Sequence, residues 1–256
     1  MISSGKYGIV IAVMVVMWSP LCNAQPYRNI FSATYLDYAQ GDPAKIFENA
    51  FVARVASQTS ILVKAYHSDR GSWNNTIISA GPVINLNRYH YLECTYGYGF
   101  DSNDREAHYL TAELTREKPG YLVMLGYRHG KYPGYSFNVL SPGVRYYLTN
   151  HFSLWGKYFA SLDSDKNYDQ AYWIEGEYRF TSRVVLKLGT TGGNRLYSPE
   201  YEYTFGGHSD MRFHSILGQI GYSFNEKLSV RYQYENMVRQ SKYTDKVNTL
   251  LVDARF

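Results

Sequence analysis

Residues 171–180 have the sequence AYWIEGEYRF, and this stretch decides the fold class because its side chains alternate in character from one position to the next. Successive side chains of a β-strand point to opposite faces, so the alternation predicts a strand. One face suits lipid and carries Tyr172, Ile174, Gly176, Tyr178 and Phe180. The other face suits water and carries Trp173, Glu175, Glu177 and Arg179. A strand with these two faces is typical of a transmembrane β-barrel.

The same period of two recurs along the chain after residue 24, where no segment places apolar residues at helical spacing. We therefore expect an all-β fold, a transmembrane antiparallel up-and-down β-barrel of about fourteen strands. Pro142 and the weak first two segments leave twelve strands as the alternative, because proline interrupts strand pairing. The predicted strands are 30–38, 50–56, 61–67, 73–83, 89–98, 107–115, 121–129, 135–148, 152–161, 170–180, 183–191, 211–224, 227–236 and 247–256.

Residues 1–24 have the pattern of a cleaved export signal. Lys6 precedes an apolar run at 8–18 that is short for a membrane span, and Cys22-Asn23-Ala24 ends in a small residue, as cleavage sites do. An uncleaved anchor is the alternative. Cleavage leaves residues 25–256 as one barrel domain with a single cysteine, Cys94, so no disulfide within the chain is expected.

The composition narrows the class further. The 256 residues are 45% hydrophobic and 17% aromatic, which excludes a disordered chain, and the mean hydropathy of −0.37 excludes a bundle of membrane helices. The net charge of +4 is too small to suggest nucleic acid as a partner. A secreted all-β domain and an outer-membrane barrel remain.

The connections between predicted strands favour the barrel. Gaps that look long and polar alternate with tight ones, as expected for a bacterial outer-membrane barrel with short periplasmic turns and longer external loops. An even strand number then places both termini in the periplasm. The long gaps are 39–48, 101–106, 162–169, 192–210 and 237–246, and the tight ones are 58–59, 118–119, 150–151, 181–182 and 225–226.

The final residue, Phe256, is a second sign of a barrel of the Gram-negative outer membrane. Such barrels commonly end in a strand with a terminal aromatic residue, which the barrel assembly machinery recognises, so we expect that machinery and outer-membrane lipid as partners. Aromatic side chains near strand ends would form the girdles at the two membrane interfaces. The candidates are Tyr89, Tyr91, Tyr146, Tyr147, Trp155 and Tyr158.

Three motifs resemble the YaiO family of outer-membrane β-barrel proteins. They are Tyr35-Leu36-Asp37-Tyr38 followed by Gly41-Asp42, Gly126-Tyr127-Arg128 with Lys131-Tyr132, and GTTGGNRLYSP at 189–199. The resemblance implies a barrel of poorly defined activity, in a family sometimes associated with glycosyltransferases and envelope polysaccharide. It implies no catalytic residues.

We expect no enzymatic activity, no metal site and no cofactor. His67-Ser68-Asp69 and His214-Ser215 contain residue types of a catalytic triad, but neighbours on a strand point to opposite faces and do not converge. The seven histidines form no metal-binding pair, and one cysteine in the exported chain is too few for a zinc site.

The predicted water-facing positions carry the candidate solute-binding residues. Cations attract carboxylates and aromatic rings stack on sugar faces, so a basic lumen with tryptophans suits acidic sugars. The structural alternative, which we favour, is that paired charges simply satisfy one another inside a narrow barrel. The candidates are Arg128, Arg145, Lys157, Trp173, Arg179, Lys187 and Arg231, with Arg54, Lys64 and Trp155 beside them and Glu93, Glu113, Glu175, Glu177 and Glu235 as the acidic groups.

Three function classes follow. The first is an accessory of, or conduit for, envelope polysaccharide or saccharide export or uptake, with envelope saccharides or a polysaccharide system as partners. The second is a porin-like channel for small solutes with a preference for anions. The third and most remote is an outer-membrane lipid hydrolase. The segment 192–210 could plug the barrel or form an external recognition surface.

Overall fold

A computed structural model describes residues 27–39, 43–70, 73–101, 106–194, 212–239 and 243–256. The predicted export signal, residues 1–24, and most of the segment 192–210 lie outside these residues. No helix in the described part of the chain is long and apolar enough to cross a membrane.

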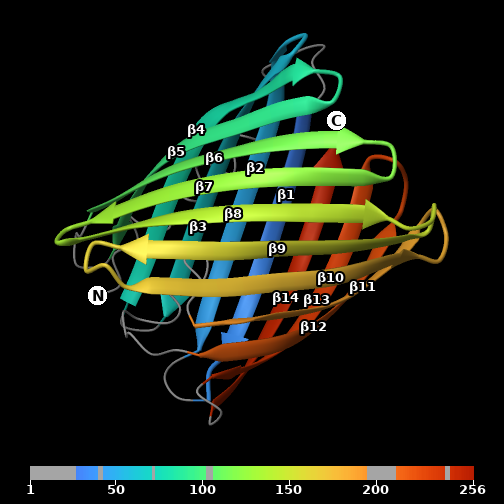
Figure 1. The fold of residues 1–256 in the computed structure, drawn as a ribbon. Coiled ribbons are helices and arrows are strands. Elements are labelled where there is room, and N and C mark those ends of the chain that lie inside the picture. The colour runs from blue at the N-terminus through green and yellow to red at the C-terminus, as the bar shows by residue number, and fades with distance from the viewer. Residues whose placement is uncertain (1–26, 40–42, 71–72, 102–105, 195–211, 240–242) are drawn as a thin grey trace, which may run out of the picture.

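The described residues form fourteen antiparallel strands in a closed barrel (Figure 1). Each strand pairs with its neighbours in sequence, and β1 pairs with β14 to complete the wall. Figure 1 shows β5–β10 in front, crossing β1–β3 and β12–β14 behind them, as tilted barrel strands do. The strands are β1 (Tyr27–Asp37), β2 (Ala44–Ala56), β3 (Thr59–Arg70), β4 (Trp73–Asn87), β5 (His90–Asp101), β6 (Glu106–Lys118), β7 (Tyr121–Tyr132), β8 (Tyr135–Tyr147), β9 (Phe152–Asp163), β10 (Tyr168–Arg179), β11 (Val184–Gly193), β12 (Phe213–Ser223), β13 (Leu228–Arg239) and β14 (Tyr243–Arg255).

All fourteen predicted strands are confirmed, and the alternative of twelve is wrong. Several strands extend further than predicted. The largest difference is in β2, which begins at Ala44 instead of residue 50, within the predicted polar gap 39–48, and carries Lys45 exposed on its outer face. Outer positions near the end of a barrel strand lie beyond the apolar band and need not be apolar.

Pro142 lies inside β8 without ending it. Leu125 pairs with Pro142 on one side, and on the other side β8 pairs with β9 both before and after the proline in the same register. Pro82 interrupts the pairing of β4 with β5 in the same way. Proline lacks an N–H and so removes a ladder hydrogen bond, but the next pairs on either side hold the strand in the wall.

The two ends of the barrel differ less than predicted. We call the end with the connections 57–58, 88–89, 119–120, 148–151, 180–183 and 224–227 the turn end, and the opposite end the loop end. The connections 71–72 and 133–134 at the loop end are as short as the tightest turns, so the predicted alternation holds clearly only for the segment between β11 and β12. Gly120 and Gly134 have positive φ angles, 88° and 77°, which suits glycine in such tight turns.

The wall closes where Tyr27 meets Phe256 at the turn end. The backbone N–H of Phe256 donates to the carbonyl of Tyr27 at 3.0 Å, and the two rings stack with centroids 4.9 Å apart. Phe256 therefore extends the pairing of β14 with β1. Its role as an assembly signal stays a prediction.

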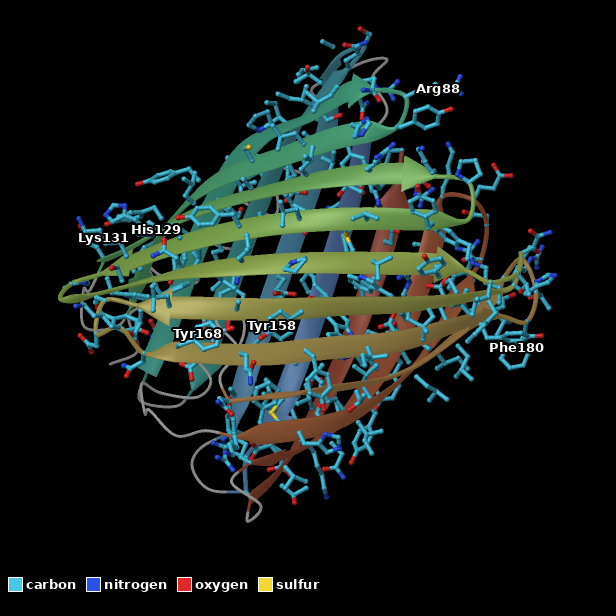
Figure 2. All side chains as sticks on the ribbon, viewed as in Figure 1. Arg88, His129, Lys131, Tyr158, Tyr168 and Phe180 are labelled. Atoms are coloured by element: carbon cyan, nitrogen blue, oxygen red, sulfur yellow. The ribbon has the colours of Figure 1, made fainter. Side chains whose placement is uncertain are left out.

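The alternation in β10 separates the two faces of the wall as predicted. Ile174 is 46% exposed on the outer face, whereas Glu175 is 4% exposed on the inner face. Figure 2 shows Tyr158, Tyr168 and Phe180 pointing outward from the barrel. Among the predicted girdle residues, Tyr146 and Tyr158 are exposed on the outer face.

Three of the predicted girdle residues point inward instead. Trp155 contacts Trp173 inside the barrel, Tyr147 lies beside the guanidinium of Arg145, and Tyr91 shares the inner face of β5 with Glu93. The prediction of a girdle rested on closeness to a strand end. The pleat decides the face, because each step of one residue reverses it.

Candidate functional site

Buried apolar side chains gather on the inner face near the loop end. The buried side chains there, which we call the loop-end cluster, are Leu36, Tyr38, Ala44, Ile46, Tyr66, Ile77, Ala107, Tyr109, Phe137, Val139 and Val247. Phe137 is fully buried, and Tyr132, Tyr135 and Phe159 pack against the cluster. The hydroxyls of Tyr109 and Tyr132 lie 2.5 Å apart. These side chains form a packed core, and Arg239, which pairs with the buried Asp245, lies over the ring of Tyr38 at its edge.

The inner face nearer the turn end is charged. All seven predicted lumen residues lie on the inner face, and the structure brings five of them together on the consecutive strands β8–β11. Those five are Arg145, Lys157, Trp173, Arg179 and Lys187. Arg128 lies on β7, on the same face as Gly126. Arg231 lies on β13 over Gly221 of β12, away from the other six.

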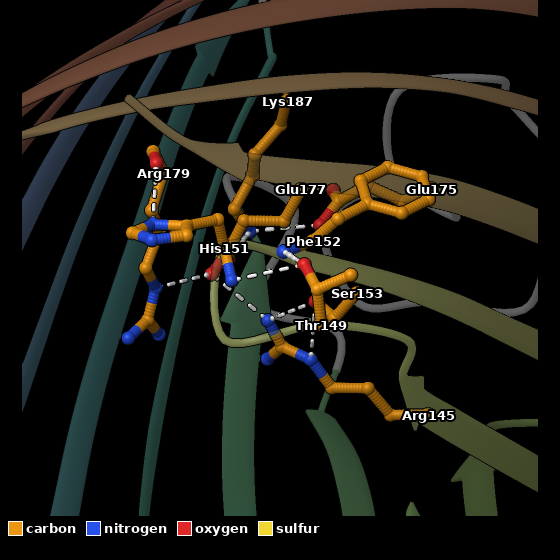
Figure 3. Close-up of polar contacts among 9 residues, drawn as sticks. All are labelled: Arg145, Thr149, His151, Phe152, Ser153, Glu175, Glu177, Arg179 and Lys187. Carbon is orange, nitrogen blue, oxygen red and sulfur yellow. Dashed lines mark hydrogen bonds and ion pairs between the residues drawn. The ribbon is translucent and has the colours of Figure 1, made fainter. Parts of the chain in front are cut away.

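Four charged side chains from β8, β10 and β11 form a continuous network (Figure 3). Arg145 Nη2 lies 3.0 Å from Glu177 Oε1, and Arg145 also donates to Ser153 Oγ at 2.9 Å. Lys187 Nζ lies 2.8 Å from Glu175 and 3.7 Å from Glu177. Ser153 is small enough for Arg145 to reach over β9 to β10. The network alternates in sign, so the carboxylates are compensated although both are largely buried.

Arg179 adds a third cation to Glu177, with Nε 3.2 Å from the carboxylate. More than half of the Arg179 side chain remains exposed at the turn end. Two carboxylates therefore face three cations in this group, and the surplus positive charge is on the side that water reaches.

A second ion pair spans two intervening strands. Lys157 Nζ on β9 lies 2.6 Å from Glu113 Oε2 on β6. Gly126 on β7 and Gly143 on β8 have no side chains in the way, since a Cβ at Gly126 would lie 3.4 Å from Glu113 Oε2 and one at Gly143 would lie 3.3 Å from Lys157 Cγ. The sequence indicated Glu113 and Lys157 as inward-facing charges, but it did not indicate that the two glycines make room for their contact. That role depends on β6, β7, β8 and β9 lying side by side.

Two tryptophans lie beside the ion pairs. The ring centroids of Trp155 and Trp173 are 4.7 Å apart with planes 41° from parallel. Trp155 is paired in register with Glu175, and Trp173 with Lys157. Within the described residues, neither indole nitrogen has a hydrogen-bond partner. Both nitrogens are buried, so the inner wall here presents aromatic surface beside surplus cations.

In both sequences with triad residue types, the neighbouring histidine and serine side chains point to opposite faces of the wall, as predicted. His67 Nδ1 lies 2.9 Å from Thr76 Oγ1 on one face of the wall, and Ser68 pairs with Asn75 on the opposite face. Ser215 is bonded to Thr191 on the inner face, whereas His214 is on the outer face. The part of the chain that the structure describes contains no cluster of three or more His, Cys, Asp or Glu side chains able to hold a metal.

No protein-family model matches the chain, and no curated protein matches it. Solved structures do. The monoaromatic hydrocarbon channel CymD is similar with a TM-score of 0.62 at 10% identity, over 99% of this chain and 93% of that one. A bacterial polysaccharide outer membrane secretin gives 0.59 at 12%, over 91% and 99%.

A FadL homologue from Pseudomonas aeruginosa gives a TM-score of 0.58 at 8% identity, over 91% of this chain and 89% of that one. Identities this low establish the fold alone. The strand order, the closure of β1 on β14 and these similarities agree. The chain therefore has the porin-like fold of outer-membrane β-barrel channels.

Proposed function

We propose that this protein handles acidic saccharides of the Gram-negative envelope, as a conduit for them or as an accessory of a polysaccharide export or uptake system. The observation that carries the proposal is the Trp155–Trp173 pair beside the charge network of Arg145, Glu177 and Lys187. Sugar rings stack on indole faces, and guanidinium groups bind carboxylates and phosphates by paired hydrogen bonds. The resemblance to the YaiO family points in the same direction.

The orientation expected for outer-membrane barrels supports access from the periplasm. In such barrels the termini and the short turns face the periplasm. The turn end would then open toward that compartment, and the charged half of the lumen with it. A saccharide leaving or entering the periplasm would meet Arg179 and Arg145 before it met the apolar core.

The loop-end cluster favours the accessory role over a permanently open pore. Phe137 is fully buried and Tyr109 is 4% exposed, so no water-filled path passes beside these inner-face side chains. A conduit would need these rings to move. An accessory that binds saccharide from the turn end would not.

Binding, passage and selectivity can be separated in one experimental series. The chain is refolded into planar bilayers, and single-channel conductance is recorded with acidic and neutral oligosaccharides of equal length added to one side. We expect small or intermittent conductance, block by the acidic oligosaccharide from the turn-end side, and weaker block in Trp173→Leu. Tyr172→Leu, which changes an aromatic residue on the outer face of the same strand, is the matched control.

Each outcome has a definite meaning. Equal block by acidic and neutral oligosaccharides, or none in a folded barrel that also fails to bind either in solution, contradicts the proposal. Stable anion-selective conductance that sugars do not affect would support the porin-like channel for small solutes instead. Binding of the acidic sugar without conductance supports the accessory role.

A further inference from the structure

A pocket of about 210 Å³ lies at the turn end, beside the seam where β1 meets β14. Three of the residues lining it are arginines, from three different strands. The lining residues are Tyr27, Arg28, Val52, Arg54, Ser60, Arg255 and Phe256. None of these arginines belongs to the lumen group around Trp155 and Trp173, which is on β8–β11.

The charges around the pocket are unbalanced. Arg28 makes a bidentate contact with Asp253, with Nε 2.9 Å from Oδ1 and Nη2 2.7 Å from Oδ2. Arg255 Nη2 lies 3.9 Å from the same carboxylate, too far for a hydrogen bond. Arg54 has no carboxylate partner among the described residues. The pocket lining therefore holds three guanidinium groups, of which only Arg28 and Arg255 lie within 4 Å of a carboxylate, that of Asp253.

The arginines open to the inside of the barrel. Arg28 and Asp253 meet on the inner face. Arg54 is paired in register with Ser60, which shares its face of β3 with Leu62 and Lys64, and Lys64 contacts Glu93 in the lumen. Both Arg255 and the Arg28 side chain are substantially exposed. The guanidinium groups therefore lie on the lumen side of the rim at the turn end.

The chemistry of the lining suits one acidic sugar unit. Guanidinium groups bind carboxylate or phosphate oxygens in pairs, and the Ser60 hydroxyl can donate or accept. The stacked rings of Tyr27 and Phe256 lie at the rim on the outer face of the wall. The volume is below that of a pocket for a drug-sized ligand, so it admits a single small group.

We propose that this pocket binds the carboxylate or phosphate group of an acidic saccharide at the turn-end mouth of the lumen. The assignment rests on the proposed handling of acidic saccharides and adds a second, separate binding site to it. Arg54, and Arg255 with its long 3.9 Å contact to Asp253, supply the guanidinium groups for the anion. Arg28 is held in place by its two hydrogen bonds to Asp253 and forms one side of the pocket.

The test is equilibrium binding to the full exported chain in detergent micelles, measured by isothermal titration calorimetry with glucuronate and with glucose. We expect glucuronate to bind and glucose to bind at least tenfold more weakly. Arg54→Gln and Arg255→Gln should each weaken glucuronate binding about tenfold, because each removes one charge-assisted contact. Arg88→Gln is the matched control, since Arg88 lies in the turn 88–89 at the same end, over the ring of Tyr89.

The variant Trp173→Leu tests whether the pocket is independent of the lumen group around Trp155 and Trp173. It should leave the affinity of the pocket for glucuronate unchanged. An unchanged affinity in the Arg54→Gln, Arg255→Gln double variant, with native migration on unheated gels, would overturn the assignment. If that variant also keeps block of conductance by acidic oligosaccharide, the proposed function survives and only the pocket is lost.

A second arm distinguishes a soluble anion from a lipid headgroup. The titration is repeated in nanodiscs of phosphatidylcholine alone and in nanodiscs containing phosphatidylglycerol. Equal glucuronate affinity in both supports the saccharide site. Competition by phosphatidylglycerol that disappears in the double variant would assign the pocket to a lipid phosphate and contradict the saccharide site.

Discussion

Lys157 Nζ lies 2.6 Å from Glu113 Oε2, although β7 and β8 separate the strands that carry them. The contact crosses the inner face over Gly126 and Gly143, and it links the wall of β6 to the wall of β9. The contact joins two strands that are not neighbours in the wall, unlike the hydrogen bonds between adjacent strands. The ion pair stabilises the wall in the charged half of the lumen, where the loop-end cluster makes no contacts.

Glycine at position 126 is expected to be necessary for this link. Gly126→Val should displace the Ser141 hydroxyl and the Glu113 carboxylate and lower the free energy of unfolding by about 1–3 kcal/mol, the usual cost of overpacking. Urea titration in lipid vesicles, followed by tryptophan fluorescence, measures the change. Gly156→Val is the control, because the nearest atom to a Cβ there is 3.9 Å away on an outward-facing position. Equal losses in the two variants would contradict the role of Gly126.

The Lys157–Glu113 pair should be more strongly coupled than an exposed pair of the same wall. Their side chains are 14% and 33% exposed, against 46% and 32% for Lys64 and Glu93, which lie 2.9 Å apart. Double-mutant cycles with Lys157→Met and Glu113→Gln should give about 1–2 kcal/mol, and the Lys64–Glu93 cycle below about 1 kcal/mol. Equal coupling energies would show that burial does not distinguish the two pairs.

Cys94 is on the outer face of β5, on the opposite side from Glu93 and Thr95. In a bilayer, a membrane-impermeant maleimide should therefore label it at least tenfold more slowly than in the unfolded chain. Glu93→Cys in a Cys94→Ala background places the thiol one residue away on the inner face and should label quickly, since the Glu93 side chain is exposed to the lumen. Rapid labelling of Cys94 in the folded barrel would contradict the register of β5.

Phe137 should stabilise the barrel and restrict passage through its loop end. The ring is fully buried in the loop-end cluster, so Phe137→Ala should lower the free energy of unfolding by about 3–5 kcal/mol. The same variant should increase conductance in planar bilayers. Leu140→Ala on the outer face of β8 is the control, and it should leave conductance unchanged. Conductance equal to the parent protein in a folded Phe137→Ala barrel would contradict closure by this cluster.

The alternation of side chains was enough to predict the fold class, a strand number of fourteen or twelve, and the face of most residues. In residues 172–179 every position falls on the predicted face, because the period of two is a local property of the extended backbone. The predictions of strand ends and of girdle residues failed where the residue type suggested one location and the position of the residue in the barrel wall gave another. The start of β2 at Ala44 was missed for that reason, and Trp155 and Tyr147 were assigned to a girdle although they point inward.

From the sequence alone we could predict a barrel of about fourteen strands, with twelve as the alternative, and cations and tryptophans on its inner wall; the structure has fourteen. Only the tertiary structure decided which of these side chains meet. Arg145 reaches Glu177 across β9, and Lys157 reaches Glu113 across β7 and β8. The arginine pocket joins β1, β2 and β14, whose arginines are far apart in sequence. Barrel closure and strand stagger bring them together, and both depend on the pairing of the whole wall rather than on any single segment.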